Sequence, residues 1–474
     1  MKIVARTLLC LTFAGTLIAH AQISSFQHIV VIVQENRTPD NLFQGLCSAP
    51  FGSSTSCSTN PSTTQYDIQT SDWLDRHSDN GVTQPLTVPL SNTYDLLHTH
   101  PAFTAMCDRN GSGACKMDGA GDVHCSGTCL SQPQFRYVDN SSGTVDPYLE
   151  MATQYGWANY MFQTNQGPSF PAHQFLFGGT SAPSADDDAA GIFASENMAG
   201  GQKAGCIATD GTTVKLITPQ GENQKVYPCF EHQTMADLLD AAGISWKYYA
   251  PGAGSIWMAP DAISHICQPD QPTGGKCTGP DWVSDVRVKP ATVLNDINNC
   301  ALARVSWIIP TGQNSDHAKG NKGGGPSWVA SIVNAIGNHS ACPNGEVYWQ
   351  NTAIIITWDD WGGWYDHEPP TFLASPEGDY QYGFRVPLLV VSAYTSAGYI
   401  NNKRHDFGTI LRFIENNFGM EEGALNFADA RSNTDLALFF HLHRAPRVFQ
   451  TIAAPMGGQD FLNDRSKPEP PDND

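Results

Sequence analysis

The chain has 474 residues, of which 41% are hydrophobic, and this length allows a large buried core. It carries 46 acidic against 26 basic side chains, which gives a formal net charge of -20. Such an excess of negative charge disfavours nucleic acid as a partner, and it disfavours steady attachment to an anionic membrane surface.

The first residues have the pattern of a secretory signal. Lys2 and Arg6 precede an apolar run from Leu8 to Ile18, and the run leads to the small-x-small sequence of residues 19–21. We therefore expect a signal peptide over residues 1–21. The apolar run is too short to cross a bilayer, and no later segment is long and apolar enough to do so. The expected location is secreted or periplasmic.

Cysteine usage fits an exported chain. Of the 13 cysteines, Cys10 lies in the expected signal and the remaining twelve form an even set. An even set in an exported chain is more often a set of disulfides than a metal site, and the absence of any C-x-x-C pair weakens structural zinc further. We expect pairing between sequence neighbours, with Cys47 and Cys57 closing a loop rich in Ser, Thr, Gly and Pro.

The first predicted strand covers Gln27 to Gln34, an apolar run rich in β-branched residues. It ends in Glu35, Asn36 and Arg37. A carboxylate and an amide oxygen directly after a buried strand are suitable ligands for a hard cation. The alternative is that Glu35 is an ordinary ion-pair partner of Arg37.

Two histidines follow at alternate positions, His98 and His100. In an extended segment they would share a face, which suits metal or phosphate binding. The stretch from Asp108 to Cys129 is rich in Gly and Cys and is expected to be a loop insertion.

Two helices are predicted in the next part of the chain. The first begins at Asp146 and ends at Gly156, and the second runs through about Phe177 with Pro171 in its first turn. Ser169 would then lie at a helix N-terminus, where backbone amides stabilise an alkoxide or a bound phosphate. The alternative is a plain serine cap. Pro171 stands where a nucleophile elbow has glycine, which disfavours an ordinary serine hydrolase.

The middle of the chain alternates helices and strands. A helix over 234–242 precedes a strand over 244–249, and a further strand over 304–310 leads into a loop with Asp316 and His317. A histidine in such a loop is a candidate general acid. The segment 327–336 has helical periodicity.

The central strand is predicted over Ala353 to Thr357, and it ends in Asp359 and Asp360. Open α/β sheets hold their ligands at the carboxyl ends of strands. Both carboxylates can face one ion only if the chain bends, which the glycines at 362 and 363 allow. The alternative is a solvated acidic loop, although the tryptophans at 358, 361 and 364 argue against it.

A last buried strand is expected over 386–392, followed by a helix that Asp406 caps and Gly419 closes. The predicted fold is a single α/β domain over residues 22–460. It has a mostly parallel central sheet flanked by helices, disulfide-stapled insertions, and a polar tail over 461–474.

Together these residues resemble the phosphoesterase family of bacterial non-haemolytic phospholipases C and related acid phosphatases, a branch of the alkaline-phosphatase superfamily. The likeness covers nearly the whole mature chain. Its motifs are ENRTPDNLF at 35–43, DLLH at 95–98 with KMD at 116–118, GPSFP at 167–171, SDH at 315–317, TWDDWGGWYDH at 357–367, and RVPLLVVS followed by HDFGTILRFIE at 385–392 and 405–415.

The resemblance implies a metal-dependent phosphoesterase. It implies a metal centre of Glu35, Asn36, Asp359 and Asp360, with Ser169 as a nucleophile that also contacts the ion. His317 then resembles the acid that protonates the leaving group, and His98 a phosphate-side group. His100 competes with His98, and His367 is a further candidate for substrate binding. First-shell ligands that are all oxygen favour calcium, magnesium or manganese over zinc.

The sequence departs from the family at several positions. Thr38 and Pro39 stand where the family usually has Ser-Phe, Ser169 where phospholipases commonly have threonine, and Asp360 where many relatives have glutamate. These departures leave open whether the substrate is a phospholipid or a phosphate monoester. The rivals are a sulfatase, whose C/S-x-P-x-R motif residues 47–50 do not match, and an exported binding protein without turnover.

Overall fold

The computed structural model describes residues 24–198, 203–371 and 381–466. The expected signal segment therefore lies outside the described residues, as does most of the expected tail. Helix α14 (Gly458–Asn463) buries Phe461 against Trp328, so ordered structure continues past the expected boundary at 460. Within the described residues, every helix is too short or too polar to span a bilayer.

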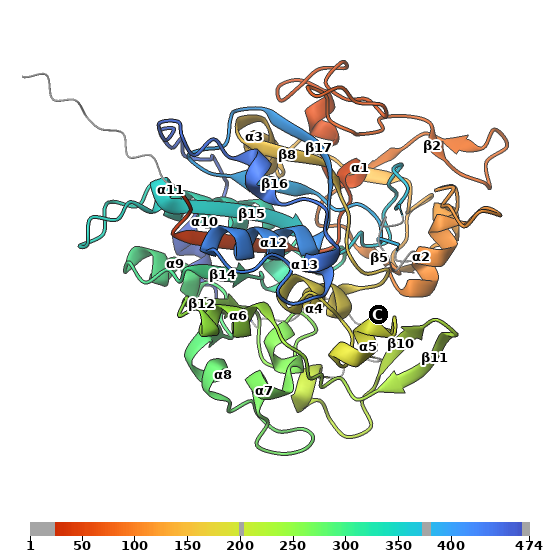
Figure 1. The fold of residues 1–474 in the computed structure, drawn as a ribbon. Helices are drawn as coiled ribbons and strands as arrows, with labels where there is room; N and C mark the ends of the chain where they lie inside the picture. The colour runs from red at the N-terminus through yellow and green to blue at the C-terminus, as the bar shows by residue number, and fades with distance from the viewer. Residues whose placement is uncertain (1–23, 199–202, 372–380, 467–474) are drawn as a thin grey trace, which may run out of the picture.

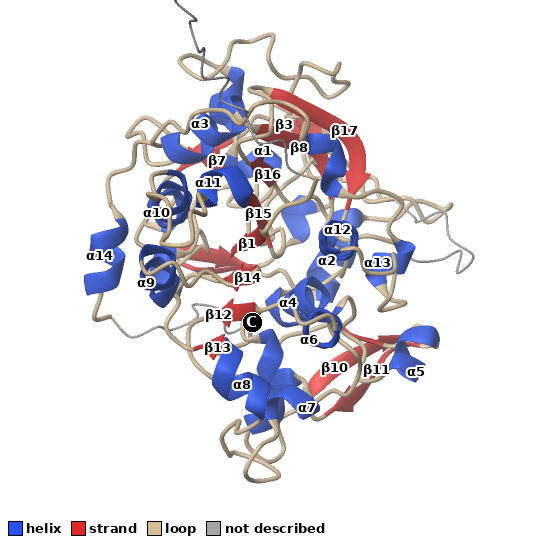
Figure 2. Ribbon diagram, turned by 60° about the vertical axis from the view of Figure 1, so that its left-hand side comes forward, coloured by secondary structure: helices blue, strands red, loops and turns tan. Residues whose placement is uncertain are grey.

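The fold is organised around an eight-stranded sheet (Figures 1 and 2). From one edge to the other, the sheet contains β13 (Val286–Arg287), β12 (Trp246–Tyr249), β14 (Val305–Ile308), β1 (His28–Gln34), β15 (Thr352–Trp358), β16 (Leu388–Val391), β8 (Gly156–Met161) and β17 (Tyr399–His405). Within this sheet β16 runs against both of its neighbours, and the other pairings are parallel. The expected mostly parallel α/β sheet is confirmed.

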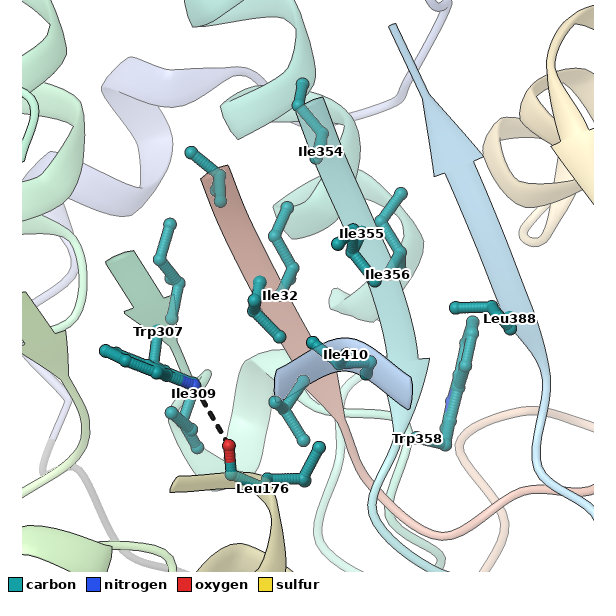
Figure 3. Packing of buried hydrophobic residues seen from close by; sticks show 14 of the residues in the cluster. Ile32, Leu176, Trp307, Ile309, Ile354, Ile355, Ile356, Trp358, Leu388 and Ile410 are labelled. Carbon is teal, nitrogen blue, oxygen red and sulfur yellow. Dashed lines mark hydrogen bonds between the residues drawn. The ribbon is translucent and has the colours of Figure 1, made fainter. Parts of the chain in front are cut away.

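The two central strands are buried along their whole length, as their uninterrupted apolar sequences predict. Strands β1 and β15 pair in register from His28 with Thr352 to Gln34 with Trp358. Their side chains pack on both faces, where Ile32, Ile356 and Ile410 lie in one cluster (Figure 3). In the same cluster the Trp307 indole donates to the carbonyl of Leu176 at 3.1 Å.

Helices cover both faces of the sheet (Figure 2). One face carries α3 (Asp146–Gln154), α9 (Thr292–Asn298), α10 (Gly325–Gly337), α11 (Tyr348–Asn351) and α14. The other face carries α4 (Ser169–Gly178), α6 (Met235–Ala241), α12 (Phe407–Phe418) and α13 (Ala428–Arg431). The expected cap of α12 is confirmed: Asp406 accepts from the Thr409 amide at 3.0 Å, and Gly419 closes the helix in a left-handed conformation.

Smaller elements surround this frame (Figure 1). The additional strands are β2 (Trp73–Leu74) with β3 (Val82–Thr83), β4 (Leu86–Val88) with β7 (Arg136–Val138), β5 (Tyr94–Leu96) with β6 (Cys125–Gly127), and β9 (Phe193–Ala194), β10 (Val214–Thr218) and β11 (Gly221–Val226) in one sheet. The additional helices are α1 (Pro39–Leu42), α2 (His100–Cys107), α5 (Ala185–Ala189), α7 (Ser264–Cys267) and α8 (Pro280–Asp285).

Disulfides staple these outer segments, and each joins cysteines that are neighbours in the sequence, as expected. The pairs are Cys47–Cys57, Cys107–Cys115, Cys125–Cys129, Cys206–Cys229, Cys267–Cys277 and Cys300–Cys342.

Candidate active site

The candidate site lies at one edge of the sheet, where several strands end. Because β1, β14, β15 and β8 run in the same direction, the segments that follow them leave the sheet at the same edge. These segments carry most of the polar side chains that the sequence singled out, and His98, which follows β5, joins them. The structure brings together Glu35, Asn36, His98, Ser169, His317, Asp359 and Asp360.

Ser169 is the first residue of α4, and Pro168 holds the capping position before it. A plain serine cap is therefore wrong, because the side chain turns toward the acidic residues and not back onto its own helix. Its hydroxyl lies 3.2 Å from Oδ2 of Asp360 and 3.5 Å from Oε2 of Glu35. All three side chains are fully buried, so a hydroxyl and two carboxylates share one small space.

The bend after β15 is built as the two glycines predict. Gly362 and Gly363 both have positive φ, at 63° and 71°. A Cβ atom on Gly362 would lie 2.4 Å from the carbonyl oxygen of Asn36, so only glycine fits there. The backbone N–H of Gly362 donates to Oδ1 of Asp360 at 2.7 Å, and the backbone N–H of Asn36 donates to Oδ1 of Asp359 at 3.1 Å. Both carboxylates are fully buried, so the solvated-loop alternative is wrong.

Asn36 lies between the acidic residues and two histidines. One end of its side-chain amide lies 3.0 Å from Oδ1 of Asp359 and 3.2 Å from Oε2 of Glu35. The other end lies 3.0 Å from Nε2 of His98 and 3.1 Å from Nε2 of His317. The residue has φ of 60°, a conformation that asparagine adopts more readily than most residues.

The histidine tautomers decide how this amide is oriented. Nδ1 of His98 lies 2.9 Å from the Leu96 carbonyl, and Nδ1 of His317 lies 2.5 Å from the Ala318 carbonyl. A carbonyl only accepts, so both Nδ1 atoms donate and each neutral ring has an accepting Nε2. The amide nitrogen of Asn36 therefore suits the histidine side. Its oxygen then faces the carboxylates, an arrangement of oxygens that needs a cation among them.

The acidic cluster fits a metal ion on a second ground. Oδ2 of Asp359 is buried and accepts no hydrogen bond from the described part of the chain. Burying several carboxylates together is costly unless they are protonated or share a cation. Glu35, Asn36, Asp359, Asp360 and Ser169 all offer oxygen atoms to this space, so the expected ligand set is compatible with a divalent ion.

His173, which was not predicted from the sequence, lies in the same cluster. It follows Ser169 by four residues on α4, so both side chains point from one face of the helix. Its Nε2 atom lies 3.2 Å from Oε1 of Glu35 and 3.8 Å from Oδ2 of Asp359. Burial lowers the pKa of His173 to about 4, although the Asp359 charge opposes this shift. The four-residue spacing from Ser169 was the available signal.

His100 does not share a face with His98, contrary to expectation. The extended segment ends at Thr99, which caps α2, so His100 is already the first residue of a helix. Its Nδ1 atom lies 3.7 Å from Glu222, and its amide donates to Glu196 at 3.2 Å. His100 is therefore held in a different group of acidic residues from His98.

His367 lies in a buried ion network beside the site. Its ring nitrogens contact Asp40 at 2.7 Å and Asp67 at 3.1 Å. Burial opposes charge on this ring, yet the two carboxylates raise the pKa of His367 to about 10. Arg385 also pairs with Asp67 at 2.9 Å and with Asp366 at 2.8 Å. Both nitrogens of His367 are engaged within this network.

Asp316 and Arg37 support the loop that presents His317. Tyr148 and Trp358 donate to Oδ2 of Asp316 at 2.7 Å and 3.0 Å, and Nε of Arg37 donates to the Asp316 carbonyl at 2.8 Å. Burial raises the pKa of Asp316 to about 6, against the hydrogen bond from Tyr148 and the Arg37 charge. The Arg37 guanidinium also lies 4.9 Å from the Trp364 ring.

Comparison with known proteins gives a consistent set of relatives. The model of the phosphoesterase family matches residues 26–421. The non-hemolytic phospholipase C of Pseudomonas aeruginosa is 25% identical over 54% of this chain and 36% of its own length. The hemolytic phospholipase C of the same organism is 23% identical over 59% of this chain and 39% of its own length. Phospholipase C A of Mycobacterium tuberculosis is 26% identical over 40% of each chain.

The match therefore spans less than half the length of these curated relatives. A solved structure from the alkaline phosphatase superfamily of Vibrio parahaemolyticus aligns over 61% of this chain and 64% of its own, with 10% identity and a TM-score of 0.34. A TM-score and an identity this low support no conclusion about fold or activity.

Proposed function

Because the chain belongs to the phosphoesterase family, we propose that it hydrolyses phosphate esters through a nucleophilic serine, Ser169. The observation that carries this proposal is the position of the Ser169 hydroxyl. It is held at the start of a helix, 3.2 Å from Asp360 and 3.5 Å from Glu35, with the Asn36 amide and two histidines beyond them.

We propose that one divalent ion is held by Glu35, Asn36, Asp359 and Asp360, together with the Ser169 oxygen. When bound, such an ion lowers the pKa of the serine hydroxyl and offsets negative charge on the phosphoryl oxygens. The chemistry of the donor atoms supports this assignment, as does Oδ2 of Asp359, which is buried and accepts no hydrogen bond within the described residues.

The first covalent step joins Oγ of Ser169 to phosphorus and breaks the bond from phosphorus to the ester oxygen. The Ser169 proton already points to carboxylate oxygens, so it has an acceptor as the nucleophile attacks. The product is a phosphoserine and a departing alkoxide. Water then cleaves the phosphoserine, releases the phosphate product and returns the hydroxyl.

His317 is the proposed acid for the departing alkoxide. Its Nδ1 proton is held by the Ala318 carbonyl, so the second proton of the imidazolium lies on Nε2, where it takes the place of the hydrogen bond from the Asn36 amide and is offered to the leaving group. His98 is fixed in the same way by the Leu96 carbonyl and contacts the same end of the Asn36 side-chain amide as His317 does. We assign His98 to the phosphate side of the site.

The substrate is a phosphate monoester or a phosphodiester of the phospholipase C type. The named activity of the curated relatives favours the phosphodiester, while the match over less than half of their length leaves the monoester open. The test is to assay the protein with p-nitrophenyl phosphate, a choline phosphodiester and p-nitrophenyl sulfate, each at acid and neutral pH. Turnover of only the sulfate ester, or of none, would contradict the proposal.

Ser169→Ala tests the nucleophile. We expect turnover to fall by roughly three orders of magnitude or more, because the variant has no atom that can carry the phosphoryl group. Ser181→Ala is the matched control, because Ser181 is equally buried but donates to the Ala194 carbonyl. Normal turnover by Ser169→Ala would overturn this mechanism.

Removal of the metal tests the ion. Exhaustive chelation should abolish turnover, and adding back a single divalent cation should restore it. Activity that is undiminished after complete metal removal, verified by elemental analysis, would refute the proposed centre.

We also propose that the protein works in an oxidising compartment, secreted or periplasmic. The six disulfides among the described residues support this location, because such bonds persist in oxidising environments. Fractionation of cells that express the full chain tests the proposal, and recovery of reduced protein in the cytosol alone would contradict it.

A further inference from the structure

His173 is a buried side chain of the site to which the proposed reaction gives no role. It lies on α4, one helical turn after Ser169, and is fully buried. Its Nε2 atom faces two carboxylates, at 3.2 Å from Glu35 Oε1 and 3.8 Å from Asp359 Oδ2. Whether this nitrogen donates a proton or offers a lone pair depends on the other nitrogen of the ring.

The partners of Tyr248 fix the tautomer of His173. The Tyr248 hydroxyl lies 3.0 Å from the Trp257 carbonyl and 3.4 Å from Nδ1 of His173. A carbonyl can only accept, so the single hydroxyl proton of Tyr248 goes to Trp257. The tyrosine oxygen then offers lone pairs to His173, and Nδ1 must carry the proton of the neutral ring. Nε2 is left unprotonated.

An unprotonated Nε2 would face carboxylate oxygens with no proton between them, which is repulsive unless a cation lies there. The distances suit that cation. Adjacent ligand atoms on an octahedral ion with bonds of about 2.1 Å lie about 3 Å apart. The separation from Nε2 to Glu35 Oε1 is 3.2 Å. Oδ2 of Asp359, the other near oxygen, is buried and accepts no hydrogen bond from the residues that the structure describes.

From this geometry we infer that His173 Nε2 is a direct ligand of the metal ion, next to Glu35 and Asp359. The inference rests on the proposed metal centre and changes its character. The ligand set becomes one of nitrogen and oxygen, and not oxygen alone as the sequence suggested. Imidazole suits iron, nickel, copper and zinc, whereas carboxylate oxygens suit magnesium, calcium and manganese, so a histidine ligand shifts the preference of the site toward the first group.

The alternative is that His173 donates from Nε2 to Glu35 and only orients it. That arrangement requires Nδ1 to accept from Tyr248, which would leave the Trp257 carbonyl without the tyrosine proton. The two alternatives differ in one measurable property: only a direct ligand places a nitrogen nucleus in the coordination sphere.

The test uses the full chain loaded with Mn²⁺ alone and examined by electron spin echo envelope modulation. We expect a ¹⁴N coupling in the wild type, and its replacement by a ¹⁵N pattern when the histidines are labelled with ¹⁵N. His173→Gln should lose the coupling, with a Kd for Mn²⁺ raised at least tenfold. His405→Gln, which removes another buried histidine, is the control and should retain the coupling.

Each outcome is informative. Tight Mn²⁺ binding without ¹⁴N coupling, or a coupling that survives in His173→Gln, would overturn the inference and leave the proposed centre intact. If the wild type does not bind Mn²⁺, or if its Mn²⁺ binding is unchanged by Glu35→Gln, both the inference about His173 and the proposed metal centre are overturned. If His173→Gln does not fold, His98→Gln and His317→Gln replace it: a coupling retained in both supports His173, and a coupling lost in either overturns it.

A second variant tests the tautomer argument separately. Tyr248→Phe removes the oxygen that holds the Nδ1 proton but keeps the ring that packs against Phe177 and Trp307. We expect Mn²⁺ binding to weaken severalfold with the nitrogen coupling retained. Unchanged binding would show that Tyr248 does not set the ligand form of His173.

Discussion

Asn36 links the acidic half of the site to its histidine half. Its amide touches Glu35 and Asp359 at one end and His98 and His317 at the other, within 3.2 Å in each case. A single side chain therefore aligns the proposed leaving-group acid with the proposed ion. Aspartate at this position would keep the size of the side chain but would remove the donor that both histidines need.

The role of His317 is testable through the leaving group. His317→Gln should lower kcat by roughly 10²–10⁴-fold for an alkyl phosphate, whose alkoxide must be protonated as it departs. The loss should be much smaller for p-nitrophenyl phosphate, because p-nitrophenolate is a stable anion. An equal loss with both substrates would assign His317 to another task.

At the residue scale, the sequence predicts site members that directly follow a buried strand. Glu35, Asn36, Asp359 and Asp360 were found in this way, because an apolar run marks the strand and its end marks the sheet edge. His173 has no such marker, since every residue of its helix is buried and a histidine there is equally compatible with a core position. His100 was misplaced because Thr99 starts a helix where an extended chain was expected.

At the element scale, the strands with apolar sequences were predictable and the polar ones were not. β1, β15 and β16 follow from apolar runs, and β14 from a run that only Ser306 interrupts. β17 does not, because its sequence YINNKRH lies at the edge of the sheet, where one side is open and polar side chains are tolerated. β8 contains the buried Asn159, whose side chain accepts from the Asp67 amide and the Trp157 indole, so its sequence looks mixed.

An ion pair between a histidine on α7 and an aspartate on α6 predicts that the free energy of unfolding depends on pH. His265 on α7 lies 3.0 Å from Asp237, whose side chain completes the capping box of α6 with Thr234, and 2.8 Å from Glu231. The hydrogen bond with Asp237 raises the pKa of His265 from 6.5 to about 9, although partial burial opposes this. Asp281 on α8 adds a weaker attraction.

The sign of this effect follows from the raised pKa. The protonated ring is favoured in the folded state, so the stabilisation is complete below about pH 6.5 and is lost as the pH rises through about 9. Because His265 and Asp237 are partly exposed, solvent screening reduces the contribution of this ion pair to folding stability to roughly 1 kcal/mol. Urea unfolding of wild type and His265→Gln should differ at pH 6 and agree at pH 10. A difference that is constant with pH would contradict the assignment.

At the scale of the whole molecule, disulfides with short loops lie in the outer segments and one bond closes a longer loop. Cys300–Cys342 closes 42 residues between the end of α9 and the segment before α11, whereas Cys125–Cys129 closes 4. Pairing between neighbours was predictable from the spacing of the cysteines. The positions of the stapled segments around the sheet were not, because they depend on tertiary packing.

Loop length predicts how much each bond stabilises the fold. In the chain-entropy account, replacing Cys300 and Cys342 together by serine should cost about 4 kcal/mol, and replacing Cys125 and Cys129 about 2 kcal/mol. Denaturant unfolding of the two double variants measures both losses. A larger loss for the short loop would mean that local packing, and not chain entropy, governs these bonds.

The order of strands in the sheet constrains how the protein is made. β1 comes first in the sequence yet lies in the middle of the sheet, between β14 and β15, whose partner residues begin at Val305 and Thr352. A nascent chain that has not reached Val305 contains neither of the strands that pair with β1. The central pair of β1 and β15 therefore cannot form until about three quarters of the polypeptide has been synthesised, which predicts slow maturation and a need for protection from aggregation until then.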